Sequence, residues 1–379
     1  MASHTFYEFF AGGGMARAGL GSAWKCLFAN DFDQKKAAIY RANWGDEEMW
    51  CGDVADVDHR QLPGDPDLVW ASFPCQDLSL AGNGTGLNGS RSGAFWPFWN
   101  VIEGLIAERR KPRTVVLENV CGLLTSRNGD DFSALCAEVA RAGYWLGGVV
   151  ADAKDFVPQS RPRLFLIAVD SHRPLRSGVQ SAQPSPHWHS KQLQTAYARL
   201  PTSIQANWLW FCPPTPAKRN LNLVDIIEDE PTGICWHSEA ETRRLLDMMS
   251  PTNRAKVDLH SANSKTAIGA IYKRTRRVDG VKAQRAEVRF DLAGCLRTPG
   301  GGSSRQSILV CRDGEIRSRL LSTRETARLM GLSDSYILPE RYNDAYHLTG
   351  DGVVVPVVRW ISQHIIECVL EADLSHEAA

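Results

Sequence analysis

The sequence predicts an α/β protein with a doubly wound, mainly parallel sheet and a second, smaller and irregular domain. Residues 1–170 alternate short apolar runs with helical patterns, which is typical of a parallel sheet covered by helices. Residues 171–220 are instead rich in Ser, Gln, Pro and Trp and show weak periodicity. The chain has 379 residues, of which 43% are hydrophobic and 23% charged, so it is long enough for two globular domains.

The apolar runs and helical patterns define the expected elements in order. The expected strands cover residues 5–10, 26–29, 68–72, 114–117, 145–151 and 164–169, and the expected helices cover 15–20, 34–42, 95–109, 132–142, 323–330 and 355–372. We therefore expect a first domain over residues 1–172, a second over 173–315, and a return to the first over 316–379. In such sheets ligands bind beyond the carboxyl ends of the strands, so the loops after strands are the candidate sites.

Composition argues against several classes of protein. The sequence has no run of about 18 apolar residues, so we expect no membrane span. The first 25 residues lack a basic start and carry Glu8 within their apolar stretch, which argues against a secretory signal. The ten cysteines form no CxxC pair. We therefore expect reduced thiols, no metal site and a location in the cytosol.

Charge is unevenly distributed along the chain. The formal net charge is zero, but residues 171–315 carry +8, whereas residues 1–170 carry −5 and residues 316–379 carry −3. Seven cations lie close together in the middle segment: Lys273, Arg274, Arg276, Arg277, Lys282, Arg285 and Arg289. A basic segment of this kind indicates contact with nucleic acid, and the alternative is an ordinary solvated surface.

Three loops near the N-terminus together predict a nucleoside cofactor. A glycine-rich loop containing Phe10, Gly12 and Gly14 follows the first strand, where backbone amides can approach a ligand. Asp31-Phe32 ends the second strand and Asp53-Val54 follows a third, which are positions for acceptors from a ribose and an adenine. Only Arg17 lies near the glycines, which favours a nucleoside without a pyrophosphate, such as S-adenosylmethionine. A tight turn without a ligand is the alternative for the glycine loop.

Two further loops carry candidate catalytic residues. Cys75 follows the strand over residues 68–72, where a thiolate would be presented as a nucleophile, and five glycines follow it in residues 80–93. Glu118 follows the strand over residues 114–117. A buried structural cysteine and an acid at a helix N-terminus are the alternatives. Arg161 and Arg163 lie two residues apart in an extended segment, so we expect both to point towards one anion or base edge.

The order of these motifs resembles the DNA (cytosine-5) methyltransferase family. The motifs that carry the resemblance are Phe10-Ala11-Gly12-x-Gly14, Pro74-Cys75-Gln76, Glu118-Asn119-Val120, Gln159-x-Arg161-x-Arg163, the run from Arg324 to Gly331, and Gly350-Asp351-Gly352-Val353. They cover residues 5–170 and 316–366. The unmatched segment between them lies where the family carries its variable target-recognition domain. In the last motif the family usually has Gly-Asn-Ser-Val, so Asp351 adds a negative charge there.

The resemblance implies a Rossmann-like methyltransferase fold and transfer of a methyl group from S-adenosylmethionine to C5 of a cytosine in duplex DNA. It implies Cys75 as the nucleophile at C6 of a flipped-out cytosine, Glu118 at N3, and Arg163 with Arg161 at the ring carbonyl. The implied cofactor contacts are Phe10, Gly12, Gly14, Asp31, Phe32, Asp53, Val54, Pro74, Asp351 and Val353. The expected DNA contacts are Gln76, Ser79, Arg91, Lys273, Arg274, Arg276 and Arg277.

Several alternatives and partners stay open at this point. A tRNA cytosine-5 methyltransferase would use the same catalytic domain, although the Cys-Phe-Thr triplet of that branch is absent. A DNA-binding regulator without catalysis is a second alternative, and a nucleotide-dependent dehydrogenase would leave Pro-Cys-Gln unexplained. Double-stranded DNA is the expected partner in a bacterial cytosol. A monomer is the default expectation, and an accompanying restriction endonuclease is left open.

Overall fold

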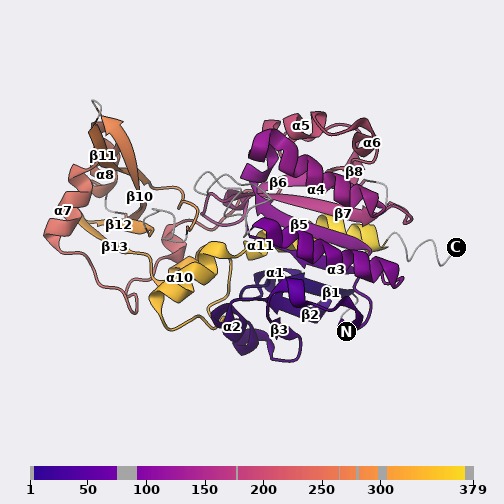
Figure 1. Ribbon diagram of the computed structural model, residues 1–379. Coiled ribbons are helices and arrows are strands. Elements are labelled where there is room, and N and C mark those ends of the chain that lie inside the picture. The colour runs from indigo at the N-terminus through magenta and orange to yellow at the C-terminus, as the bar shows by residue number, and fades with distance from the viewer. Residues whose placement is uncertain are drawn as a thin grey trace. The chain divides into compact units, whose positions relative to one another are not determined.

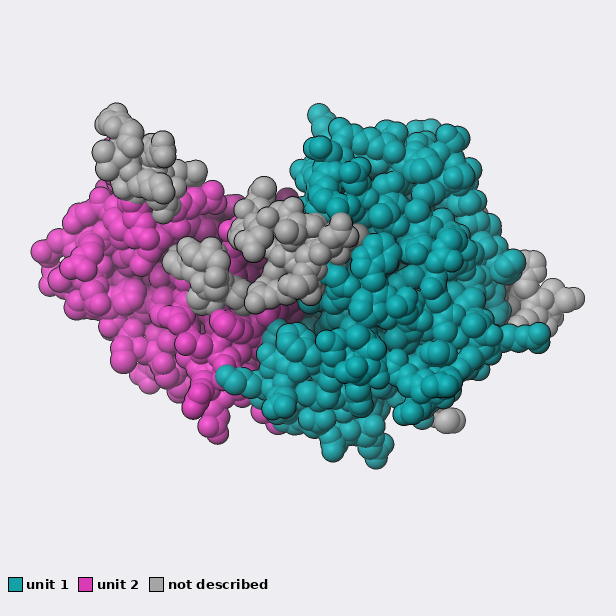
Figure 2. Space-filling model, in the orientation of Figure 1, with its two compact units in different colours: residues 1–152, 162–215, 353–379 teal, residues 153–161, 216–352 magenta. Residues whose placement is uncertain are grey.

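The chain folds around two main sheets, as a computed structural model shows (Figure 1). The structure describes residues 4–74, 92–175, 178–263, 265–278, 281–297 and 305–371. The chain divides into two compact units (Figure 2). Unit 1 comprises residues 1–152, 162–215 and 353–379, and unit 2 comprises residues 153–161 and 216–352.

A seven-stranded mixed sheet forms the centre of unit 1. Its strand order is β3-β2-β1-β4-β5-β7-β6, with β1 (His4–Phe9), β2 (Trp24–Asp31), β3 (Met49–Cys51), β4 (Leu68–Ala71), β5 (Thr114–Val120), β6 (Tyr144–Asp152) and β7 (Pro162–Asp170). The first five strands are parallel, and β7 runs antiparallel between β5 and β6. This topology confirms the predicted doubly wound α/β class and brings the carboxyl ends of β1 to β5 to one edge.

Helices cover both faces of this sheet. They are α1 (Met15–Leu20), α2 (Gln34–Trp44), α3 (Phe95–Ala107), α4 (Asp130–Arg141) and α11 (Val355–Ile361). Phe98 of α3 and Leu135 of α4 share a buried core with Phe9 and Val115 of the sheet. Burial of such side chains contributes roughly 1.5–3 kcal/mol each, so the apolar strands largely determine this packing. Helices α1 and α11 pack against each other although they lie far apart in sequence.

The segment 178–215 belongs to unit 1 and not to a separate middle domain. It contains β8 (Gln180–Ser181), α5 (Lys191–Ala198), α6 (Thr202–Gln205) and β9 (Trp210–Phe211). Trp208 and Trp210 join the core of the main sheet. The Leu209 amide donates to the Leu146 carbonyl at 2.8 Å, and a Cβ at Gly147 would meet the Leu209 carbonyl oxygen at 1.9 Å. The absence of a side chain at position 147 thus lets this segment cover the free edge of β6.

Unit 2 is built on a four-stranded antiparallel sheet in the order β11-β10-β12-β13. The strands are β10 (Ala267–Val278), β11 (Val281–Arg289), β12 (Ser307–Arg312) and β13 (Glu315–Leu320), and the helices are α7 (Glu239–Asp247), α8 (Pro251–Ser261), α9 (Thr323–Leu329) and α10 (Tyr342–Asp351). Leu245 of α7 and Val257 of α8 pack on Ile271 and Val288 of the sheet.

Unit 2 extends to residue 352, whereas the sequence analysis expected a return to the first domain at 316. Arg319 of β13 forms a fully buried ion pair with Glu325 of α9 at 2.7 Å. The Gln306 amide donates to the hydroxyl of Tyr346 on α10 at 2.9 Å. These buried polar contacts hold α9 and α10 against the small sheet, because leaving either partner unpaired would cost several kcal/mol, on the order of 3–5 for the ion pair.

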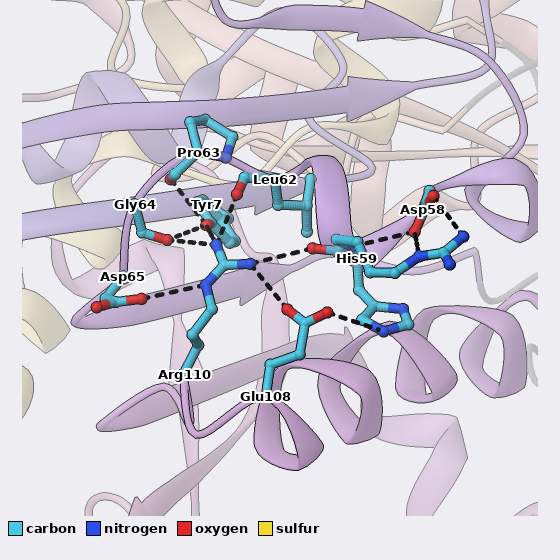
Figure 3. A network of polar contacts seen from close by, with 10 residues as sticks. Tyr7, Asp58, His59, Leu62, Pro63, Gly64, Asp65, Glu108 and Arg110 are labelled. Atoms are coloured by element: carbon cyan, nitrogen blue, oxygen red, sulfur yellow. Dashed lines mark hydrogen bonds and ion pairs between the residues drawn. The ribbon is translucent and has the colours of Figure 1, made fainter.

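Arg110 ties together the loops at the amino ends of β4 and β5 (Figure 3). Its guanidinium donates to the carbonyls of Leu62, at 2.6 Å, and Gly64, and to the hydroxyl of Tyr7 at 3.1 Å. It also contacts the carboxylates of Asp65 and Glu108, each at 3.1 Å. This edge of the sheet lies opposite the carboxyl ends of the strands, so the network supports the fold away from the candidate site.

One helical stretch of the described chain, Tyr342–Glu371, is long and apolar enough to cross a membrane by length and composition. It is interrupted at residues 352–354, and 56% of its apolar window is buried inside the protein. A buried, interrupted helix of this kind is typical of a globular core. The nine cysteines that the structure describes all carry free thiols.

Candidate active site

The glycine loop lies at the carboxyl ends of β1 and β2 and is shaped by Asp31. The Asp31 carboxylate accepts from the Gly12 amide at 2.7 Å and from the Asp33 amide at 2.9 Å. Phe10, Gly12 and Gly14 have positive φ angles of 56°, 57° and 79°. A Cβ at Gly12 would meet no atom within 4 Å, so the loop borders open space. The two strand ends that the sequence analysis combined are therefore brought together.

The neighbouring strand ends add an exposed aromatic ring and a capping acid. Phe32 is 70% exposed directly after β2, which is unusual for a large apolar side chain. Asp53 caps a short helical turn by accepting from the Ala55 amide, while Val54 is buried. Burial raises the pKa of Asp31, and the positive charge of Lys36 opposes this shift. An exposed ring, an open glycine loop and two carboxylates form a donor and acceptor set that fits a nucleoside.

Asn30 is a structural residue of this site that the sequence analysis did not assign. Its buried side chain donates to the carbonyl of Gly52 at 2.9 Å and so joins the end of β2 to the loop that carries Asp53. In the sequence, the sign of this role is an amide side chain directly before Asp31. The role depends on a contact with Gly52, 22 residues away, which the spacing alone does not reveal.

Glu118 and Arg163 form an ion pair at the carboxyl end of β5. The Arg163 Nε atom lies 3.3 Å from Glu118 Oε1. Strand β7 pairs antiparallel with β5 so that Val120 lies opposite Arg163. Since side chains two residues apart share a face, Glu118 and Arg163 project to the same side. Glu118 is 7% exposed, and a carboxylate removed from water to this extent gains most from a cationic neighbour.

Asn119 connects this strand end to the segment before the predicted nucleophile. Its side chain donates to the Phe73 carbonyl at 3.2 Å and accepts from the Val120 amide at 2.9 Å. Pro74 follows Phe73 and is the last described residue of this segment. The chain leading to Cys75 is thereby anchored beside Glu118. Cys75, Gln76, Ser79 and Arg91 themselves lie outside the described residues.

Cys121 lies close to the Glu118–Arg163 ion pair. Burial raises the pKa of its thiol to about 11, although the positive charge of Arg163 opposes the shift. The thiol therefore keeps its proton at neutral pH and is unsuited to nucleophilic attack, which requires the thiolate.

Arg161 and Arg163 have different partners, which differs from the expected convergence on one ligand. Arg161 belongs to unit 2 and is almost fully buried. Its guanidinium donates to the carbonyls of Gly350 and Gly352, both at 2.8 Å, and to the carbonyl of Leu296 at 3.1 Å. It thus joins segments about 135 to 190 residues away in sequence, at separations that no local pattern encodes.

The remaining predicted residues lie on separate elements. Asp351 ends α10 and is exposed, whereas Val353 is buried in unit 1. Lys273 and Arg274 lie on β10. The side chains of Arg276 and Arg277 lie outside the described part of the chain. Within the residues that the structure describes, no group of three or more His, Cys, Asp or Glu side chains is arranged to hold a metal ion.

The sheet topology and the side chains at its carboxyl edge agree with the methyltransferase class expected from the sequence. The family of C-5 cytosine-specific DNA methylases matches residues 4–367, and the chain belongs to this family. It is accordingly a DNA (cytosine-5) methyltransferase, which confirms the resemblance found in the sequence and implies a methyl donor and a DNA substrate.

Named relatives are similar to this chain over almost its whole length. The type II methyltransferase M.HhaI of Haemophilus parahaemolyticus is 24% identical over 95% of this chain and 93% of its own length. M.NlaX of Neisseria lactamica is 26% identical over 94% of this chain and 95% of its own.

Solved structures show the same fold. The Dnmt2 methyltransferase of S. pombe covers 96% of this chain and 98% of its own, with a TM-score of 0.57 and 16% identity. A putative DNA modification methyltransferase of an E. coli prophage covers 97% of this chain and 100% of its own, with a TM-score of 0.58 and 14% identity.

Proposed function

We propose that the chain transfers a methyl group from S-adenosylmethionine to C5 of a cytosine that is flipped out of a specific site in duplex DNA. The reaction proceeds through a covalent bond between Cys75 Sγ and C6. The observation that carries this proposal is the Glu118–Arg163 pair, which lies beside the Asn119 contact that anchors the chain leading to Cys75.

The covalent route follows from the chemistry of the base. C5 of cytosine is a poor nucleophile, but addition of the Cys75 thiolate to C6 makes C5 an enamine-like carbon that can form a bond to a methyl group. Loss of the C5 proton to a base then restores the C5–C6 double bond and expels the thiolate. A water molecule is the candidate for that base. Cys121 keeps its proton and is therefore not a competing candidate for the attack.

Glu118 and Arg163 would stabilise the charge that develops on the ring. As the thiolate adds, negative charge accumulates towards N3, and a carboxyl group that donates a proton there relieves it. A carboxyl group donates near pH 7 only when its site is desolvated, which the burial of Glu118 supplies, whereas Arg163 beside it favours the carboxylate until charge develops on the ring. Arg163 would orient Glu118 and hold the ring carbonyl. Arg161 donates to the backbone carbonyls of Gly350 and Gly352, so it would position that loop and would not itself contact the base.

The cofactor would be held at the carboxyl ends of the first three strands. Phe32 would stack on the adenine, Asp31 would accept from the ribose hydroxyls, and Asp53 with Val54 would border the base. Phe10, Gly12 and Gly14 would form the loop, and Pro74 and Val353 would complete the pocket. When bound, S-adenosylmethionine supplies an electrophilic methyl group. A contact from Asp351 stays a prediction from the last motif.

Access to C6 requires the cytosine to leave the stacked duplex. Gln76, Ser79 and Arg91 are proposed to contact the DNA around the emptied position. Lys273, Arg274, Arg276 and Arg277 would supply contacts from unit 2, mainly to phosphates, which position the duplex without reading its sequence. The relatives are named as type II methyltransferases, so we propose a matching restriction endonuclease as a genetic partner. We infer action as a monomer in the bacterial cytosol.

A tRNA substrate is the second candidate. The fold of the S. pombe Dnmt2 methyltransferase matches, but at 16% identity the likeness supports the fold alone. The family match and the relatives favour DNA.

Incubation with labelled S-adenosylmethionine and either duplex DNA or tRNA, followed by nucleoside analysis, tests the proposal. We expect 5-methylcytosine in the DNA and not in the tRNA. Label in tRNA alone would favour the second candidate. Cofactor binding without label in either substrate would favour a binding-only regulator.

A further inference from the structure

We propose that Trp44, the last residue of α2, is a positioning residue for the cofactor, because its indole N–H fixes the peptide between Gly13 and Gly14 in the shape that binds S-adenosylmethionine. This inference rests on the proposed function and deepens it. Neither Trp44 nor Gly13 is among the cofactor contacts expected from the sequence.

The peptide between Gly13 and Gly14 is held at both of its polar groups. The Trp44 Nε1 atom donates to the Gly13 carbonyl at 3.0 Å. The Gly14 amide donates to the Ala11 carbonyl at 2.8 Å. The carbonyl and the amide of one trans peptide point in opposite directions, so the two bonds together prevent this peptide from turning over. The glycine loop is thereby fixed at the point where it enters α1.

The indole ring lies directly against the backbone of this loop. Gly14 has a φ angle of 79°, and a Cβ at this position would meet Trp44 Nε1 at 2.3 Å and the Tyr40 ring at 2.9 Å. A side chain at position 14 would therefore push the loop away from α2. The absence of one brings the Gly13 carbonyl within hydrogen-bond distance of the indole.

Arg17 keeps the Trp44 ring in place. The central carbon of its guanidinium lies 5.3 Å from the centre of the Trp44 ring and 5.6 Å from that of the Tyr40 ring. A cation within about 6 Å of an aromatic ring is attracted to its face. Arg17 also donates to the Tyr40 hydroxyl at 3.0 Å and to the Glu48 carboxylate at 3.2 Å. These contacts restrict rotation of the indole, so its N–H stays directed at the loop.

Helix α2 is joined to the glycine loop at both of its ends. At its start, the Asp33 amide donates to the Asp31 carboxylate, which also accepts from the Gly12 amide. At its end, Trp44 donates to the Gly13 carbonyl. One helix of 11 residues thus holds two adjacent peptides of the loop. A loop already held in its binding shape loses less conformational freedom when the ligand binds, which raises affinity.

The expected effect of Trp44 is on cofactor binding and not on methyl transfer. The residues proposed to act on the cytosine ring, Glu118 and Arg163, belong to β5 and β7, whereas Trp44 contacts the loop after β1. An interaction that is equally strong before and during the reaction changes KM and leaves kcat as it is. Loss of the indole N–H should therefore raise KM for the cofactor.

The test compares Trp44→Phe, which keeps an aromatic ring but has no N–H, with the control Trp188→Phe in the full chain. Trp188 Nε1 also donates to a backbone carbonyl, that of Pro213 at 2.7 Å, but it lies beside β6 at the far edge of the sheet. Calorimetric titration gives Kd for S-adenosylmethionine, steady-state kinetics on duplex DNA give KM and kcat, and thermal unfolding gives Tm. All assays are made below the lowest Tm.

We expect Trp44→Phe to raise Kd and KM for S-adenosylmethionine about three- to tenfold, the range for one hydrogen bond, with kcat within about twofold of the wild type. Trp188→Phe should leave Kd and KM unchanged even where it lowers Tm. This split separates positioning of the cofactor from a general loss of stability.

Three outcomes would overturn the inference. They are a wild-type Kd in Trp44→Phe, an equal rise of Kd in Trp188→Phe, and a fall of kcat in Trp44→Phe at unchanged KM. If the wild type binds S-adenosylmethionine and methylates DNA in these cases, the inference on Trp44 alone fails. If the wild type binds no S-adenosylmethionine, the proposed function fails together with it.

Discussion

Glu8 is a buried carboxyl group on β1, beneath the first turn of α1. Burial raises its pKa to about 8, although the positive charge of Arg17 and the amides of Ala16 and Arg17 oppose the shift. Its Oε2 atom is buried and has no hydrogen-bond partner among the described residues. A group in this environment is most stable in its protonated, neutral form.

The pH dependence of stability follows from this shift. The ordinary pKa is 4.5, so between about pH 4.5 and 8 the folded chain holds a proton that the unfolded chain has released. The stabilisation that the bound proton provides is complete below about pH 4.5 and is lost as the pH rises through about 8. We expect Glu8→Gln, which keeps a neutral side chain, to unfold at higher urea than the wild type at pH 8.

Urea denaturation of wild type and Glu8→Gln at pH 5.5 and pH 8 checks this expectation. The difference between the two proteins should widen at pH 8 by an amount on the order of a few kcal/mol. An equal difference at both pH values would show that Glu8 is ionised throughout.

Glu118→Gln tests the catalytic carboxyl group. The amide keeps the size of the side chain but cannot deliver the acidic proton to N3. We expect turnover to fall about 100-fold or more while DNA affinity stays near that of the wild type. Single-turnover methylation and duplex binding measure the two quantities separately. Turnover near that of the wild type would assign the role at N3 to another group.

At the scale of residues, the sequence predicted the placement of side chains that belong to a local motif. The glycine loop and Asp31 lie 19 residues apart and meet as expected, with a hydrogen bond from the Gly12 amide. The partners of Arg161 could not be predicted in the same way. Its acceptors belong to Leu296, Gly350 and Gly352, and only the tertiary fold brings these carbonyls together.

At the scale of elements, Arg110 is the clearest single determinant of how loops and strands are joined. Its planar guanidinium serves several acceptors at once, which a lysine ammonium cannot do. We expect Arg110→Lys to lower the free energy of unfolding by about 2–4 kcal/mol, because the carbonyls of Leu62 and Gly64 and the hydroxyl of Tyr7 lose donors. Since the network lies at the amino ends of the strands, KM for the cofactor should not change.

Thermal and urea denaturation, together with steady-state kinetics at a temperature where both proteins are folded, check this prediction. Arg60→Lys is a matched control, because Arg60 is exposed and pairs only with the nearby Asp58 among the described residues. A change in KM without a change in stability would contradict the account.

The elements of unit 1 were largely predictable, whereas most of those of unit 2 were not, apart from helix α9, which matches the helix expected over residues 323–330. Strands such as β5 and helices such as α3 bury continuous or one-sided apolar sequences, and these patterns are local. The sequence analysis did not predict helix α10. It is held through the Tyr346 hydroxyl and the Gln306 amide, a contact between residues 40 positions apart. The antiparallel direction of β7 is likewise decided by pairing and not by its composition.

At the scale of the whole molecule, the chain passes between its two units more often than the sequence suggested. The boundary expected at 172 falls inside unit 1, because Trp208 and Trp210 pack into the core of the large sheet. The boundary expected at 315 falls inside unit 2, because Arg319 is paired with Glu325. Composition and charge identified a distinct middle region but could not reveal which core its ends join.

The central claim is that this chain methylates cytosine in DNA through Cys75. The most direct measurement is the formation of 5-methylcytosine in duplex DNA by the wild type, by Cys75→Ala and by the control Cys235→Ala, whose cysteine is exposed in unit 2. We predict label in the wild type and the control, and none in Cys75→Ala at unchanged DNA affinity. Label at the wild-type rate in Cys75→Ala, or none in the wild type, would contradict the account.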